Sequence, residues 1–131
     1  TEDWMFLFAY QKARNADEKR KISSDYVRFA ESDVAYREKA AEKMFGRPIA
    51  HVLLVHANAV TADNLTRLID MYRSRGYKFV SVEEALKDPV YAKPDKYSPT
   101  SDWLRGWSIS KGVEIDPPQP PEYIRAASRT R

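Results

Sequence analysis

The segment 52–80 is the feature that most limits what this chain can fold into. The wholly apolar run 52–55 and the run 77–80, which is apolar except for Lys78, flank a stretch whose apolar residues recur at helical spacing. A strand, a helix and a second strand in this order require a right-handed crossover and parallel pairing. Two parallel strands alone do not make a stable sheet. The sequence therefore predicts an α/β fold whose other strands come from a partner chain or from a segment outside these 131 residues.

The helix within this unit is predicted from apolar residues at positions i, i+3, i+4 and i+7: Leu65, Leu68, Ile69 and Tyr72. Thr61 is predicted to cap its start and Gly76 to end it. Ser81 and Glu84 have the spacing of a capping box, which predicts a further short helix directly after the second strand.

The first third of the chain is predicted to be helical. Asp3 is a suitable N-cap for a first helix whose apolar stripe begins with Trp4, Leu7 and Phe8. A second, longer helix is predicted from residues at alternating spacings of four and three: Ile22, Tyr26, Phe29, Asp33, Tyr36 and Ala40. Gly46 should end that helix. Such a stripe is typical of a helix that packs on a core.

The C-terminal part carries weaker signals. Trp103 and Trp107 are predicted to pack their indole rings on the body of the protein. Residues 111–131 form a Pro-rich tail, in which 116–121 is typical of polyproline conformation. This tail is expected either to be mobile or to dock on another surface.

Composition excludes several classes of protein. The chain has no Cys, so a disulfide scaffold, a thiolate metal site and a cysteine nucleophile are excluded. With two His residues, a self-contained His-rich metal site is not expected. No apolar run approaches the roughly 20 residues of a membrane-spanning helix, so we expect no membrane span. The first residues lack the basic and apolar regions of a signal peptide.

The charge of the chain does not favour a nucleic-acid partner. Lys and Arg total 22 against 19 Asp and Glu, a net charge of +3. Most basic residues have acidic neighbours, as in the run 17–21, which is typical of a solvated helix face with local ion pairs. Without a concentrated basic stripe or a binding motif, we expect no nucleic acid among the partners.

His56 is the most informative single residue. It directly follows the predicted strand 52–55, at the carboxyl end where α/β folds place catalytic groups. A carboxylate beside its ring, such as that of Asp3, would fix the tautomer and favour proton donation near neutral pH. Locally, His56 could equally satisfy a backbone group and Asp3 could simply cap a helix. His51 lies an odd number of residues earlier, so the two rings would face opposite sides of a strand and not share a metal.

Several motifs together resemble a known family. The chain resembles the C-terminal half of bacterial polysaccharide deacetylases in three places: Asp3-Trp4, the run 53–56 with the following 57–59, and the segment 75–85. These are the NodB-homology enzymes of carbohydrate esterase family 4, here in the branch described as predicted xylanase or chitin deacetylase. The resemblance covers about 1–107 and is most specific in 51–91. It implies a domain over 1–110, part of a distorted (β/α) barrel with a helical insertion at 5–45, followed by the tail 111–131.

The resemblance also implies roles for particular residues. His56 corresponds to the catalytic acid that protonates the departing amine or alcohol, and Asp3 to the carboxylate that tunes it. Leu54 corresponds to the apolar floor for the acetyl methyl group, and Trp4 to an aromatic wall of the substrate groove. The implied substrate is an acetylated glycan, and the implied location is periplasmic or extracellular.

The metal-binding motifs of that family are missing from this sequence. It contains no Asp-Asp pair and no His-x-x-x-His. The divalent metal of the complete enzyme, zinc by resemblance, is therefore not expected on this chain alone, which should be inactive. A missing N-terminal half or a second copy is the expected partner. The alternative is a non-catalytic binding or structural module derived from the same fold.

Overall fold

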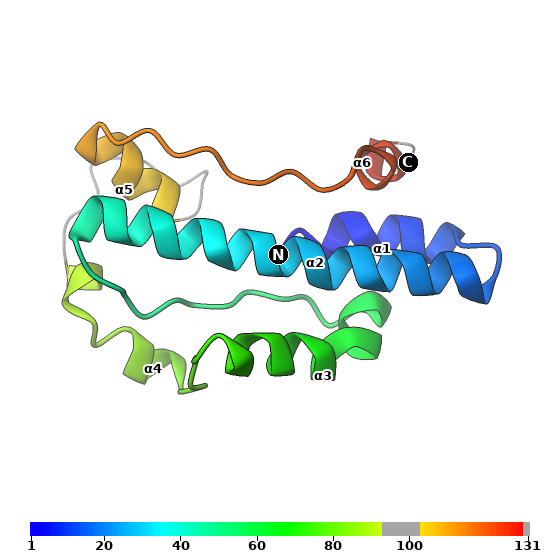
Figure 1. Cartoon of the computed structure of the whole chain (residues 1–131), viewed down its shortest axis with the longest axis horizontal. Helices are drawn as coiled ribbons and strands as arrows, with labels where there is room; N and C mark the ends of the chain where they lie inside the picture. Colours follow the sequence, from blue (N-terminus) through cyan, green and yellow to red (C-terminus); the bar gives the residue numbers. More distant parts are fainter. Residues whose placement is uncertain (93–102, 130–131) are drawn as a thin grey trace. The chain divides into compact units, whose positions relative to one another are not determined.

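The structure, a computed structural model, describes residues 1–92 and 103–129, and these parts of the chain are built from helices (Figure 1). The six α-helices and one 3₁₀-helix found there are α1 (Asp3–Lys12), α2 (Ala16–Phe45), α3 (Ala59–Ser74), α4 (Val82–Ala85), η1 (Pro89–Ala92), α5 (Trp103–Lys111) and α6 (Glu122–Arg129).

The predicted α/β fold is wrong for the part of the chain that the structure describes. Neither 52–55 nor 77–80 forms a strand there, and no other described segment does, so there is no pair of parallel strands and no portion of a barrel. Both apolar runs lie at the surface, with Leu54 71% and Val80 58% exposed. A strand needs a neighbour to accept and donate its backbone hydrogen bonds. The apolar pattern is real, but within 1–92 and 103–129 no second strand pairs with it.

The chain divides into two compact units, each described here by itself. Unit 1 contains Thr1–Asp33, Leu53–Lys78 and the described part of the segment from Pro118 onward. Unit 2 contains Val34–Val52 and the described part of Phe79–Pro117. Helix α2 contributes its first residues to unit 1 and its last residues to unit 2.

The core of unit 1 is centred on Phe6 of α1. Its ring centroid lies 5.2 Å from that of Tyr26 and 5.7 Å from that of Phe29, both on α2. Phe6 and Tyr26 are fully buried. This confirms the predicted core face of the long helix, on which Ile22, Tyr26 and Phe29 are all buried.

The predicted core face of the first helix is wrong. Its buried residues are Asp3, Phe6, Ala9 and Tyr10, whereas Trp4 is 38% exposed. The run 4–8 is apolar at every position, so its spacing does not select one face. Packing against α2 selects Phe6 and Tyr10 instead.

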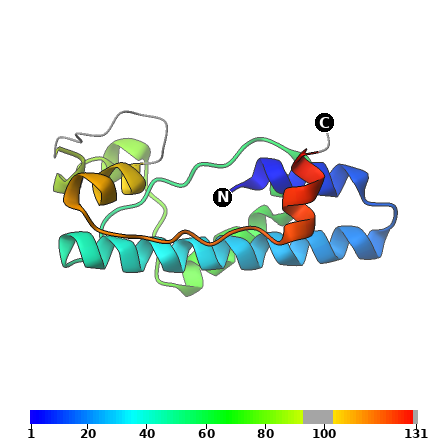
Figure 2. The same cartoon turned by 90° about the horizontal axis from the view of Figure 1, so that it is seen from above.

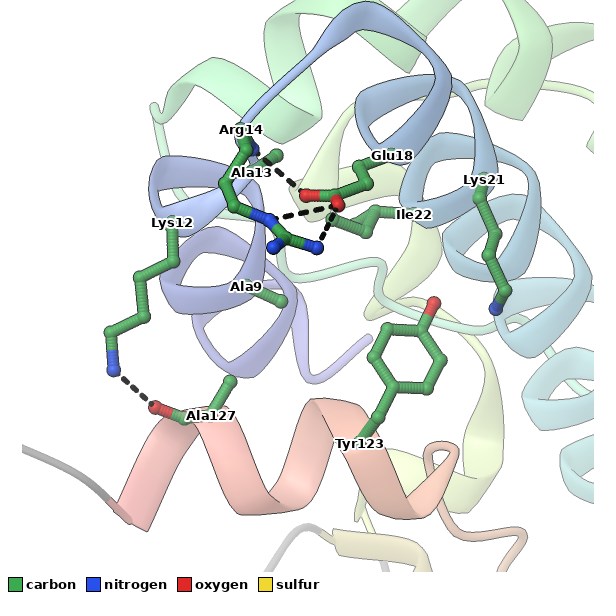
Figure 3. Close-up of a pocket in the computed structure, with 9 residues that line it drawn as sticks. All are labelled: Ala9, Lys12, Ala13, Arg14, Glu18, Lys21, Ile22, Tyr123 and Ala127. Carbon is green, nitrogen blue, oxygen red and sulfur yellow. Dashed lines mark hydrogen bonds and ion pairs between the residues drawn. The ribbon is translucent and has the colours of Figure 1, made fainter.

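The C-terminal helix α6 docks on unit 1. It crosses α1 (Figure 2), and Ile124 on α6 is fully buried. The Lys12 ammonium donates to the carbonyl of Ala127 at 3.2 Å, and the Tyr123 hydroxyl donates to Asp25. A largely apolar pocket of about 340 Å³ lies where α1, α2 and α6 meet (Figure 3).

Unit 2 has its own apolar core, made of the buried residues Ala40, Ala41, Met44, Ile49, Val90, Leu104 and Trp107. The predicted packing of two indole rings is confirmed: Trp107 is buried, and Trp103, although 51% exposed, has its ring centroid 4.9 Å from that of Tyr91. Gly46 has φ +67° and follows the last residue of α2, as the predicted helix end requires.

The carboxylate of Asp88 connects several segments of the chain around this core. It pairs with the Arg47 guanidinium and accepts backbone N–H bonds from Ala50 and Val90, each at 3.0 Å. The Arg47 guanidinium, helped by these N–H groups, holds the pKa of Asp88 far below its usual range, although burial opposes the shift. A lowered native pKa means that Asp88 stabilises the fold when ionised and loses this effect as the pH falls through its native pKa.

We therefore expect Asp88→Asn to lower the free energy of unfolding at pH 7 by about 1–3 kcal/mol, because the amide cannot accept all of these hydrogen bonds. The difference from the wild type should shrink below about pH 4, where Asp88 begins to be protonated in the unfolded chain while it stays ionised in the folded one. Urea unfolding at the two pH values measures both effects. Glu84→Gln, which removes an exposed ion pair with Lys87 in the same unit, is the control and should change little. Equal stability of Asp88→Asn and the wild type at pH 7 would contradict this role.

Candidate functional site

The candidate site is built around the carboxylate of Asp3, which the fold buries. Asp3 is the first residue of α1 and is only 1% exposed. The preceding residue, Glu2, has φ 50°, in the left-handed region that residues with a side chain rarely adopt. Its carbonyl accepts the N–H of Met5 at 2.9 Å, which starts the helix. The N-terminal end of α1 favours a negative charge at this position.

His56 contacts Asp3 although the two residues are 53 positions apart in the sequence. The backbone N–H of His56 donates to Oδ2 of Asp3 at 3.0 Å. Its ring Nδ1 lies 3.0 Å from Oδ1 and 3.2 Å from Oδ2 of the same carboxylate. The sequence singled out these two residues, and the structure brings them together.

Three further side chains donate to the same carboxylate. The Asn58 amide reaches Oδ2 at 2.7 Å, the Thr61 hydroxyl reaches Oδ2 at 3.3 Å, and the Thr1 hydroxyl lies 3.0 Å from Oδ1. Burial alone raises the pKa of Asp3, but the hydrogen bonds from His56 and Thr1 outweigh it, so the pKa lies below its ordinary value. Asp3 is therefore ionised at neutral pH.

An ionised Asp3 fixes the protonation of the His56 ring. A carboxylate can only accept, so Nδ1 must carry the hydrogen that joins them. The other ring nitrogen, Nε2, has no hydrogen-bond partner among residues 1–92 and 103–129, and the His56 side chain is 58% exposed. The ring is thus held at one nitrogen and open to solvent at the other, which allows it to exchange a proton with a bound molecule.

Sequence reasoning missed Asn58, Thr61 and Thr1. Helix α3 begins at Ala59 and is capped by Asn58, whose Oδ1 accepts the N–H of Thr61 at 2.9 Å, so the predicted cap at Thr61 is wrong. Asn is as good an N-cap as Asp or Ser. An Asn three residues before Thr61 was therefore the signal from which this cap could have been predicted. The contacts of Thr1 and Thr61 with Asp3 join distant segments, and no local pattern indicates them.

Trp4 and Leu54 are both accessible, as predicted substrate-contacting residues must be. The Trp4 indole N–H donates to Glu2 at 2.9 Å, and its ring meets Phe8 edge to face at 6.3 Å. Leu54 is 71% exposed, and its carbonyl accepts from the Thr1 hydroxyl at 3.0 Å. These contacts link the Trp4 side chain to Glu2 and Phe8, and the Leu54 backbone to Thr1. Among the described residues, no hydrogen bond or ring contact joins either side chain to His56.

The residues of this site do not form a metal centre. Over 1–92 and 103–129, no three His, Asp or Glu side chains lie together in a way that could hold a metal ion. Both oxygens of Asp3 already accept hydrogen bonds, and Nδ1 of His56 is directed at them. A metal could take only Nε2 of His56 here, which is fewer ligands than a zinc site uses.

No family model matches this chain, and neither the curated proteins nor the solved structures contain a match. The resemblance to polysaccharide deacetylases stays a prediction that rests on the residues quoted above. None of the helices in the described ranges is long and apolar enough to cross a membrane. The site itself consists of an imidazole whose Nδ1 is bound to a buried, ionised carboxylate and whose Nε2 is free to transfer a proton.

Proposed function

We propose that this chain supplies the general acid of a metal-dependent hydrolase that removes acetyl groups from a polysaccharide. The observation that carries the proposal is the pairing of His56 with the buried carboxylate of Asp3. These are the two residues to which the resemblance assigns proton donation and its tuning. A buried carboxylate that orients an imidazole through Nδ1 is a recurrent arrangement for acid–base catalysis.

The proton transfer follows from the geometry. In the imidazolium form, Nε2–H of His56 donates to the amine or alcohol that departs as the acyl C–N or C–O bond breaks. The bonding electrons go to the departing atom, which takes the proton, and the ring becomes neutral with Nδ1–H still bound to Asp3. Solvent then returns a proton to Nε2. Throughout, Asp3 stays ionised and stabilises the positive charge of the ring.

Substrate contacts and the metal complete the proposal. Trp4 forms a wall of the sugar groove and Leu54 the floor for the acetyl methyl group. The metal ligands belong to another polypeptide segment, an N-terminal half; a second copy of the chain has the same sequence and cannot supply the missing motifs. Leu53 and Leu54, three and two residues before His56, are 39% and 71% exposed, and such a segment would cover them. An acetylated glycan substrate places the complete enzyme in the periplasm or outside the cell.

The purified chain supplied with zinc should release no acetate from acetylated chito-oligosaccharide, because its described residues do not assemble a metal site. Acetate can be quantified by an enzyme-coupled assay against a buffer blank. Zinc-dependent release above that blank would contradict the assignment of the metal ligands to another segment.

Joining the chain to the segment encoded directly upstream of Thr1 tests the function itself. The proposal predicts that this segment carries an Asp-Asp pair and a His-x-x-x-His motif, and that the joined protein releases acetate when zinc is present. An upstream segment without these motifs, or a folded joined protein without activity, would contradict the proposal.

The second candidate is a non-catalytic module, and the missing Asp-Asp and His-x-x-x-His motifs favour it. Such a module would bind acetylated chito-oligosaccharide with an affinity that does not depend on whether residue 56 is His or Gln. Calorimetric titration of the two forms, together with the acetate assay of the joined protein, separates the two candidates.

A further inference from the structure

Asn58 has two different partners at the two ends of its side-chain amide. Oδ1 accepts the backbone N–H of Thr61 at 2.9 Å and so caps α3. Nδ2 donates to Oδ2 of Asp3 at 2.7 Å, the shortest hydrogen bond made to that carboxylate. The amide orientation is fixed from both sides, since a backbone N–H can only donate and a carboxylate can only accept.

This bond holds one oxygen of the carboxylate that contacts the His56 ring. Oδ2 is held by the Asn58 amide and by the backbone N–H of His56, while Oδ1 lies 3.0 Å from the ring Nδ1. Without the amide, Oδ2 would keep the His56 N–H and the longer 3.3 Å bond from Thr61. The Thr61 hydroxyl is a weak substitute, because its bond to Oδ2 is 3.3 Å long, whereas that of the Asn58 amide is 2.7 Å.

We propose that Asn58 is a positioning residue that orients the Asp3 carboxylate, and through it the His56 ring, in addition to capping α3. The role in catalysis rests on the proposed function, but the orientation of the ring does not. Among the good N-cap residues, Ser, Thr and Asp provide the acceptor that α3 needs, and only Asn adds an amide N–H for the carboxylate. An Asp at this position would instead place a second carboxylate against Asp3.

The side-chain chemistry gives variants that separate the two roles. Asn58→Ser and Asn58→Asp keep a capping oxygen and lose the amide donor, whereas Asn58→Ala loses both. If Asn58 only caps the helix, Asn58→Ser should behave like the wild type and Asn58→Ala should be destabilised, while Asn58→Asp adds the repulsion of a second carboxylate in either case. If Asn58 positions Asp3, Ser and Asp should fold and still disturb the His56 ring.

The readout is a long-range ¹H–¹⁵N correlation spectrum of the full chain at neutral pH, with the His56 signals assigned from their loss in His56→Gln. In the wild type, Nδ1 should give the signal of a protonated ring nitrogen. In Asn58→Ser and Asn58→Asp, the Nδ1 and Nε2 resonances should move from their wild-type positions, while those of His51 stay in place. Circular dichroism and thermal melting verify folding.

Wild-type ring resonances in both variants would overturn the proposal. Loss of the helical signal in Asn58→Ser would also overturn it, because the amide would then be needed for folding and not for orientation. The spectra require no turnover, so failure of the joined protein to release acetate would reject the proposed function and leave this inference standing.

Discussion

In the protein joined to its metal-binding segment, His56→Ala should reduce acetate release from an N-acetylated glycan by about 10²- to 10⁴-fold, the usual contribution of a general acid. The loss should fall on kcat and leave KM nearly unchanged, because Nε2 of His56 acts when the bond to the departing amine breaks. Steady-state rates with acetylated chito-oligosaccharide measure both parameters.

The leaving group distinguishes an acid from a binding residue. An activated aryl acetate departs as a phenolate and needs little protonation, so its hydrolysis should be far less sensitive to His56→Ala. His51→Gln, five residues earlier, is the matched control and should retain wild-type rates. Equal losses with both kinds of substrate, or full activity of His56→Ala with the glycan, would remove His56 from the role of general acid.

We expect the second large effect from replacement of Asp3, which should lower both the free energy of unfolding and the rate of acetate release. Asp3→Ala leaves the N–H of His56, the Asn58 amide and the Thr61 hydroxyl without the carboxylate that accepts from them, and that carboxylate belongs to a residue only 1% exposed. Because each buried donor without a partner costs about 1–3 kcal/mol, the free energy of unfolding should fall by about 3 kcal/mol or more at pH 7.

The pH dependence of this effect has a definite sign. The pKa of Asp3 is lower in the folded chain than its ordinary value, so its stabilising effect is present above the unfolded pKa of about 3.9. It is lost as the pH falls through the native pKa, and the gap between wild type and Asp3→Asn should narrow on acidification. Urea unfolding from pH 7 down to pH 3 measures that gap.

Asp3→Asn should also disturb catalysis while nearly preserving the shape of the side chain. An amide at this position can donate to the ring and hold the wrong tautomer, which in a Ser-His-Asp triad reduces kcat by about 10⁴-fold. Asp63→Asn is the control, because Asp63 accepts from Tyr10 in the same unit and does not contact His56 through any hydrogen bond found in the described residues. Wild-type stability and rate in Asp3→Asn would contradict the assigned role of the carboxylate.

The long helix was predictable because its signal is local and repeated. Residues Ile22, Tyr26 and Phe29 on α2 are buried as their spacing indicates, and Gly46 ends the helix with a positive φ. The first helix was predicted, but its N-cap is Glu2 and not Asp3, which is the first helical residue. Its buried face was predicted wrongly because an apolar residue stands at every position from 4 to 8. There, packing against Tyr26 and Phe29 decides which side is buried.

Whether the two predicted strands form could not be decided from the local sequence pattern. A run such as 52–55 is compatible with a buried strand, but a strand forms only where another backbone pairs with it. Leu53 and Leu54 are exposed instead. For the site, the residue types of Asp3 and His56 indicated acid–base chemistry. The contact between them joins segments that are distant in the sequence, so no local pattern predicts it. The capping role of Asn58 can be found from local sequence, but its bond to Asp3 cannot. Asn58 was therefore overlooked as a residue of the site.

The state of the His56 ring in the wild-type chain is the most direct test of the account. A long-range ¹H–¹⁵N correlation spectrum at a pH where the ring is neutral distinguishes a hydrogen on Nδ1 from one on Nε2. The account predicts that Nδ1 is protonated, bound to the ionised Asp3, and that Nε2 carries the free lone pair that takes up the catalytic proton. A neutral ring with the hydrogen on Nε2 and none on Nδ1 would contradict it.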